Sequence, residues 1–164
     1  MNYTDVLTGL RKIIRSVNLE SKRIEKEYGI SIPQLLCLNF LNNQHNFQAS
    51  QTEIKDFLSL NASTVTGIIN RLEKKGLIAK LPKREDKRVS YISITAKGAD
   101  LIQNTPELLH ERLTQKLKSI SPSSLGELQQ AFKIIADFLD VENLDASPII
   151  TAEVSIKSPN PPED

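Results

Sequence analysis

The first forty residues show two different hydrophobic patterns. From Val6 to Tyr28, apolar residues recur mostly at steps of three and four, which predicts a helix with one apolar stripe that ends at Gly29. The next segment, ISIPQLLCLNFLNNQ, is apolar on nearly all sides and has Pro33 near its first turn, which predicts a buried helix. The polar run NNQHN at its end predicts a loop. The stripe of the first helix consists of Val6, Leu10, Ile13, Ile14, Val17, Ile24 and Tyr28.

Two helix starts follow, separated by a short turn. Ser50 and Glu53 have the spacing of a capping box, which predicts a helix over about residues 51–57. The turn LSLN leads to Asn61, a good N-cap, and to a second helix that ends at Gly76. Two helices joined in this way, the second with a polar outer face, form a helix-turn-helix. The inner face of the second helix is marked by Val65, Ile68, Ile69 and Leu72.

The rest of the pattern predicts a hairpin, two more helical stretches and a tail. LIAKL and VSYISIT read as the two strands of a β-hairpin. Thr95 can cap a helix over about residues 96–118, in which Pro106 forces a kink or a break. Ser121 and Pro122 open a last helix, and beyond Val141 the periodicity fails, so we expect a disordered tail. The last helix has apolar residues at steps of three and four, namely Leu125, Leu128, Phe132, Ile135 and Leu139.

Charge is segregated along a chain that is almost neutral as a whole. The 164 residues suffice for one domain with a core, and their net charge of +1 excludes a polycation that binds acids indiscriminately. Between Arg71 and Lys97, however, nine bases face three acids, a net charge of +6. From Asp137 to the end, one base faces seven acids, a net charge of −6. Any nucleic-acid or membrane role must therefore come from this local segregation of charge.

The sequence predicts a soluble cytoplasmic protein without a membrane partner. Cys37 is the single cysteine, so an internal disulfide is excluded, and no apolar run follows a basic start. No stretch approaches the ~20 consecutive apolar residues that span a bilayer.

The outer face of the second helix in the pair carries small hydrogen-bonding residues. Short hydroxyls can contact phosphates or bases, and Asn or Arg can make bidentate contacts to adenine or guanine in the major groove. The alternative is an ordinary solvated surface. The candidate DNA-binding residues are Ser63, Thr64, Thr66, Gly67, Asn70 and Arg71.

The predicted hairpin has a strongly basic tip in the segment KREDKRVSY. Four cationic residues fall within six positions, namely Lys83, Arg84, Lys87 and Arg88. Taken alone, such a tip is typical of a solvated turn. Next to a capped helix-turn-helix it favours a second projection that reaches the DNA backbone or the minor groove, where arginine is favoured.

These segments resemble the MarR family of bacterial transcriptional regulators. The resemblance rests on STVTGIINRLEKKGLI, on the D-x-R of Asp86 and Arg88, and on TAKG from Thr95 to Gly98. It covers about residues 6–139. It implies a mainly α fold with a small β-hairpin wing, in which a winged helix-turn-helix lobe over about 31–98 joins dimerisation helices over about 3–28 and 96–141. Residues 1–141 would form one unit, and 142–164 an acidic, disordered tail.

The resemblance also implies roles for particular residues. The helix with the six hydrogen-bonding residues would be the recognition helix, with Arg71 near the DNA backbone. Arg88 matches the arginine of the wing that enters the minor groove, and Asp86 matches the acid that holds it. Gly67 departs from the family, because relatives often carry a long polar or basic side chain there. The candidate wing residues are Lys83, Arg84, Asp86, Lys87 and Arg88.

The function implied is that of a sequence-specific regulator of transcription, acting as a repressor. It would bind double-stranded DNA as a homodimer, on a near-palindromic operator with half-sites about 34–36 Å apart, and many relatives are released by a small-molecule effector. The apolar stripes of the first and last helices independently favour self-association. The alternative is a winged-helix module that binds another protein, although such a surface should show aromatic anchors.

Other classes of function find little support. His45 and His110 lie far apart and belong to no metal-binding motif, and no phosphate loop or nucleophile motif indicates an enzyme or a cofactor. Cys37 lies in the most apolar helix, which favours an inert core residue over a redox sensor. RNA binding is disfavoured because no stacking aromatics accompany the basic residues.

Overall fold

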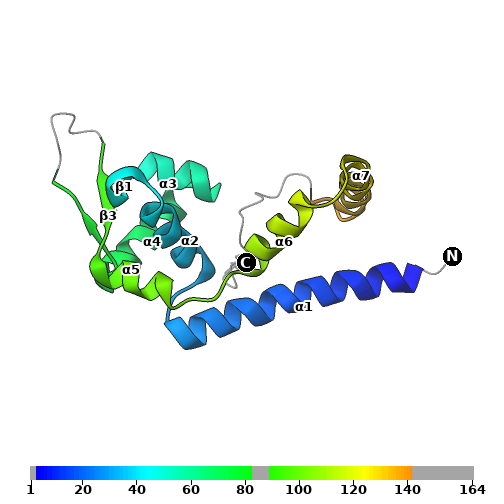
Figure 1. Ribbon diagram of the computed structural model, residues 1–164, viewed down its shortest axis with the longest axis horizontal. Coiled ribbons are helices and arrows are strands. Elements are labelled where there is room, and N and C mark those ends of the chain that lie inside the picture. Colours follow the sequence, from blue (N-terminus) through cyan, green and yellow to red (C-terminus); the bar gives the residue numbers. More distant parts are fainter. Residues whose placement is uncertain (1–2, 83–88, 142–164) are drawn as a thin grey trace, which may run out of the picture.

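The protein is mainly helical, with one small sheet (Figure 1). The computed structural model describes residues 3–82 and 89–141. The winged helix fold predicted from the sequence is confirmed. Along the chain the elements are α1 (Tyr3–Tyr28), α2 (Ile32–Asn42), the 3₁₀ helix η1 (His45–Phe47), β1 (Gln48–Ser50), α3 (Gln51–Leu58), α4 (Ala62–Lys74), β2 (Ile78–Lys80), β3 (Tyr91–Ile94), α5 (Ala96–Gln103), α6 (Leu109–Lys118) and α7 (Pro122–Phe138).

The hydrophobic core surrounds α2. Buried side chains of this helix meet those of α3, α4 and the sheet, together with Ile24 of α1 and Leu108. A capping box begins α2, because Ser31 N–H donates to Gln34 Oε1 at 3.0 Å and the Gln34 N–H faces Ser31 Oγ at 3.5 Å. The same contacts give the buried Gln34 amide a partner.

The sheet confirms the predicted hairpin and adds a strand that the sequence did not reveal. The order is β1–β3–β2, both pairs are antiparallel, and Ile78 lies opposite Ile94. β1 pairs with the other edge of β3, with Gln48 opposite Ser93. In the run NNQHN, predicted as a loop, Asn43 and Gln44 lie outside any helix or strand, and η1 and then β1 follow. Three residues are too short for a hydrophobic period, and β1 exists only through its pairing with β3.

The predicted interruption at Pro106 is confirmed. α5 ends at Gln103, and α6 begins only at Leu109. Leu108, just before α6, is fully buried, and its N–H donates to the Glu111 carboxylate at 2.8 Å. The connection between the two helices is thus anchored in the core.

We call α1, α6 and α7 together the helical arm. The arm extends away from the lobe that holds the sheet (Figure 1). In α1 only Ile24 is buried, and the described parts of α6 and α7 have no buried residue. Leu109 N–H donates to Glu20 Oε1 at 2.7 Å and joins α6 to α1. Exposed apolar side chains on the arm are Tyr3, Val6, Leu7, Ile13, Ile14, Leu19, Leu113, Leu128, Phe132, Ile134 and Phe138.

None of the helices in the described part of the chain combines the length and the apolar character that a membrane crossing needs.

Candidate nucleic-acid interface

The first helix of the pair begins with the predicted capping box. The N–H and the hydroxyl of Ser50 each lie 2.7 Å from Glu53 Oε2, and Glu53 N–H donates to Ser50 Oγ at 3.2 Å. The backbone hydrogen bond from Ser50, followed by that from its hydroxyl, lowers the pKa of Glu53. The charged carboxylate therefore holds the start of α3 in place.

The turn between α3 and α4 fixes how the second helix is presented. Ser59 adopts a left-handed conformation, with φ 51° and ψ 40°, and ends α3. Asn61 then caps α4, as predicted, by accepting the N–H of Thr64 at 2.8 Å. The four predicted inner residues of α4 are buried, so its opposite face is turned to solvent.

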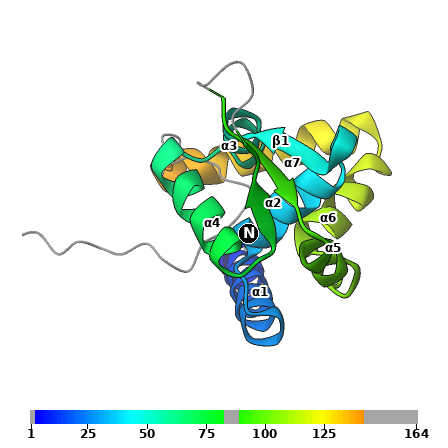
Figure 2. The same cartoon turned by 90° about the vertical axis from the view of Figure 1, so that its left-hand side faces the viewer.

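All six predicted recognition residues lie on the outer part of α4. Ser63, Thr66, Asn70 and Arg71 are exposed, whereas Thr64 and Gly67 are partly buried. The helix runs beside the strands of the hairpin (Figure 2). A ligand that approaches this side would meet α4 and the hairpin together.

Two of the hydroxyls on this face already have partners within the protein. Ser63 Oγ donates to Asn61 Oδ1 at 2.7 Å, and Thr66 Oγ1 donates to the Ala62 carbonyl at 2.8 Å while accepting from Gln51 Nε2 at 2.7 Å. A hydroxyl has only one proton to donate. The hydroxyl oxygens of Ser63 and Thr66 can therefore only accept hydrogen bonds from a ligand. Thr66 also offers a methyl group for apolar contact.

Asn70 is held by a lysine from the hairpin. Lys80 Nζ donates to Asn70 Oδ1 at 2.9 Å and pairs with Glu73 Oε2 at 2.9 Å. An ammonium can only donate, so the amide oxygen of Asn70 faces Lys80 and its NH₂ group is left for another partner. Sequence reasoning named Asn70 but missed Lys80, because this contact joins a helix to a strand.

Residues 30–90 match the model of the MarR family. This segment contains α2, the helix-turn-helix and β2 as described above. The resemblance to the MarR family that the sequence predicted is thereby confirmed over this segment. The expectation that the chain is not an enzyme agrees with its relatives, which are named as regulators of transcription.

The relatives are named as regulators of transcription. Over 129 residues, 79% of each chain, it is 25% identical to the uncharacterized HTH-type transcriptional regulator YfiV of Bacillus subtilis. It is 27% identical to the HTH-type transcriptional repressor IacR of Pseudomonas putida, covering 75% of this chain and 71% of IacR. It is 26% identical to the transcriptional repressor MprA of Escherichia coli, covering 82% and 77%.

Solved structures share the fold. The Staphylococcus aureus MepR–DNA complex superposes with a TM-score of 0.59 at 18% identity, covering 85% of this chain and 99% of MepR. The DNA complex of Sco3205, a MarR family regulator from Streptomyces coelicolor, gives a TM-score of 0.59 at 18% identity, covering 90% and 94%.

The predicted wing residues lie outside the described residues. These are Lys83, Arg84, Asp86, Lys87 and Arg88. The strands that flank them are described, and Leu81 N–H donates to the Tyr91 carbonyl at 2.8 Å, just past the end of β2.

The remaining candidates from the sequence do not converge on a second site. Cys37 is fully buried, and burial raises the pKa of its thiol to about 12, so the thiol stays protonated at neutral pH. Among the residues that the structure describes, no three His, Cys, Asp or Glu side chains are grouped as metal ligands.

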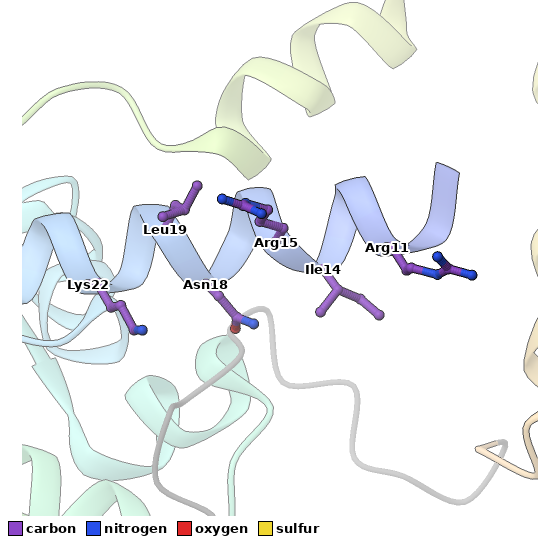
Figure 3. Close-up of a pocket in the computed structure, with 6 residues that line it drawn as sticks. All are labelled: Arg11, Ile14, Arg15, Asn18, Leu19 and Lys22. Atoms are coloured by element: carbon purple, nitrogen blue, oxygen red, sulfur yellow. The ribbon is translucent and has the colours of Figure 1, made fainter. Parts of the chain in front are cut away.

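A shallow hollow of about 420 Å³ lies along α1 (Figure 3). Three cations project from the helix there, together with an amide and two apolar side chains. The residues that line it are Arg11, Ile14, Arg15, Asn18, Leu19 and Lys22.

Proposed function

We propose that this protein is a regulator of the MarR family that binds double-stranded DNA sequence-specifically and represses transcription. The observation that carries the proposal is the orientation of α4, whose apolar face is buried while its hydrogen-bonding face is exposed. A helix with this face fits the major groove of B-form DNA. The relatives IacR and MprA are named as repressors, and MepR and Sco3205 share the fold in complexes with DNA.

The two parts of the interface have different roles in this proposal. The helix α4 contacts base edges and nearby phosphates through its outer residues. These are Ser63, Thr64, Thr66, Gly67, Asn70 and Arg71. The wing residues Lys83, Arg84, Lys87 and Arg88 contact the adjacent backbone and minor groove, with Arg88 inserted and Asp86 holding its guanidinium.

The helical arm supports a homodimer. Its exposed apolar side chains, such as Ile13 of α1 and Phe132 of α7, have about half of their surface accessible. Pairing two arms would remove this apolar surface from water. In the proposal, residues 1–141 form one unit, with dimerisation helices over about 3–28 and 96–141, the lobe over about 31–98 and an acidic tail over 142–164. A twofold dimer would present two copies of α4 to half-sites about 34–36 Å apart.

Release by a small-molecule effector completes the proposal. The hollow along α1 is a candidate place, because Arg11, Arg15 and Lys22 suit an anionic ligand (Figure 3). Since its proposed target is double-stranded DNA, the proposal places the protein in the cytoplasm.

The test is binding to DNA from upstream of its own gene, measured by fluorescence anisotropy across a salt series. We expect affinity to fall steeply with salt, because each neutralised phosphate releases counterions. Arg88→Ala should weaken binding by about 1–3 kcal/mol. Lys26→Ala, which removes an exposed cation at the end of α1, is the control for net charge.

The opposite outcome would support a protein-interaction module. Weak binding to several unrelated promoter fragments, a flat salt response and equal effects of Arg88→Ala and Lys26→Ala would contradict DNA binding.

A further inference from the structure

The guanidinium of Arg71 lies over Gly67, in the centre of the exposed face of α4. A Cβ atom added to Gly67 would lie 3.7 Å from Arg71 Nη1, 3.8 Å from Nη2 and 3.9 Å from Cζ. The whole planar end of the side chain thus covers the glycine. It occupies the space into which a longer side chain at position 67 would extend.

This arrangement follows from the geometry of a helix. Residues four apart lie on the same face, and side chains lean towards the N-terminus, so that a residue covers the turn before its own Cα. A glycine inside a helix is less favourable than an alanine. At position 67 it leaves the backbone open to the guanidinium of Arg71.

Arg71 is also free to bind a ligand. Among residues 3–82 and 89–141, none forms a hydrogen bond or an ion pair with its side chain. Its neighbours on this face already form hydrogen bonds within the protein. The hydroxyls of Ser63 and Thr66 donate to protein oxygens, and Lys80 donates to the amide oxygen of Asn70. The five N–H donors of Arg71 are therefore the largest set of unused donors on the recognition face.

We propose that Arg71 reads a guanine in each half-site, from the position that Gly67 leaves open. The proposal rests on DNA binding by α4 and changes the role of Arg71 from a backbone contact to a base contact. Guanine presents O6 and N7 as two acceptors in the major groove, and the guanidinium fork matches them with two parallel hydrogen bonds. An ammonium carries the same charge but lacks this fork.

The experiment first selects operator sequences from random DNA with the wild-type protein and then measures affinity for every single-base-pair change in a half-site. We expect one G·C pair whose change to A·T weakens wild-type binding roughly tenfold to a hundredfold. For Arg71→Lys, changing this G·C pair to A·T should weaken binding only a few-fold. Changes at the other base pairs should weaken its binding as much as they weaken that of the wild type. Lys74→Ala removes a neighbouring exposed cation on α4 and should keep the guanine preference.

Gly67 provides a matched pair of variants in which Arg71 itself is retained. In Gly67→Ala the added methyl group lies at an ordinary contact distance from the guanidinium, so Arg71 stays in place and the guanine preference persists. In Gly67→Leu the longer side chain takes the place of the guanidinium, so the preference should be lost. Circular dichroism and thermal melting would check that each variant folds.

Two results would overturn the inference. One is that Arg71→Lys and Arg71→Ala weaken binding to all sequences by the same factor, as loss of a phosphate contact would. The other is that Gly67→Leu keeps the guanine preference. If the wild type selects no sequence and its binding is flat with salt, the proposed function fails and this inference fails with it.

Discussion

Gly98 shows how a single residue sets the position of an element. A Cβ at this position would overlap the carbonyl oxygen of Leu77 and lie 2.8 Å from Ile94 Cγ1. The close approach arises because Thr95 N–H donates to the same Leu77 oxygen at 3.1 Å, while the Thr95 hydroxyl donates to the Gly76 carbonyl at 2.7 Å. The first turn of α5 is thereby fixed against the end of the helix-turn-helix, and only a residue without a side chain fits.

Replacing Gly98 by alanine should therefore destabilise the fold. Since the overlapping atom belongs to the backbone, the clash requires a shift of α5, and we expect a loss of about 1–3 kcal/mol in the free energy of unfolding. Urea denaturation followed by circular dichroism measures it. Gly126→Ala in α7 is the matched control, because the added methyl meets no atom within 4 Å. Equal stability of the two variants would contradict the packing described here.

At the scale of elements, the short connection from α4 to β2 shapes the recognition face. Gly76 has φ 71° and donates to the Glu73 carbonyl at 2.8 Å, while Leu77 N–H donates to the Leu72 carbonyl at 3.0 Å. This closes α4 with a Schellman motif, so that β2 begins directly beside the helix. Lys80 is thereby brought against Asn70.

We expect Lys80 to act on DNA binding through Asn70. Lys80→Met should leave stability almost unchanged, because a half-exposed ion pair such as Lys80–Glu73 contributes about 0–1 kcal/mol. It should weaken operator binding by about 0.5–1.5 kcal/mol, since the Asn70 amide loses the hydrogen bond that orients it. The affinities are measured by fluorescence anisotropy.

A double-mutant cycle separates this role from simple charge attraction. If Lys80 orients Asn70, Lys80→Met has little effect once Asn70 is alanine. Additive effects of the two substitutions would instead show that Lys80 attracts phosphates directly.

At the scale of the whole molecule, the core and the helical arm differ in how completely they are buried. The core around α2 contains fully buried side chains from the lobe, whereas the described residues of α6 and α7 are all exposed or only partly buried. A helix with a stripe of exposed apolar residues needs a second surface to cover it. The arm is the part of the molecule where the proposed dimer would form.

Charge introduced into the arm should therefore separate the dimer. Phe132→Asp places a carboxylate in the exposed apolar face of α7, and we expect it to raise the dimer dissociation constant at least about thirtyfold. Sedimentation equilibrium measures this dissociation constant. Operator affinity should fall in parallel, because a monomer contacts only one of the two half-sites. Phe47→Asp changes an equally exposed aromatic on the lobe and should leave the dimer intact: Phe47 is 57% exposed and Phe132 52%. Equal behaviour of the two variants would contradict a dimer built on the arm.

The sequence by itself determined where most elements begin and which residues of α4 lie outside. The capping pairs at Ser50, Asn61 and Thr95 each join residues three apart, and the buried positions of α4 follow from the period of the helix. Such interactions are local, so they are present in the order of the residues. The resemblance to the MarR family could be recognised from the sequence because its motifs are local as well. DNA contacts by α4 and by residues 83–88 stay predictions.

The tertiary structure alone decided how separate elements use one another's groups. β1 forms because β3 offers it a free edge, and the amide of Asn70 is oriented by Lys80 from a strand. Of the apolar stripe of α1, only Ile24 is buried, because the core is already filled by the lobe. The place of Arg71 over Gly67 depends on a rotamer that the sequence leaves open. These contacts join residues whose distance in space is set by packing, and no local pattern of residue types encodes that distance.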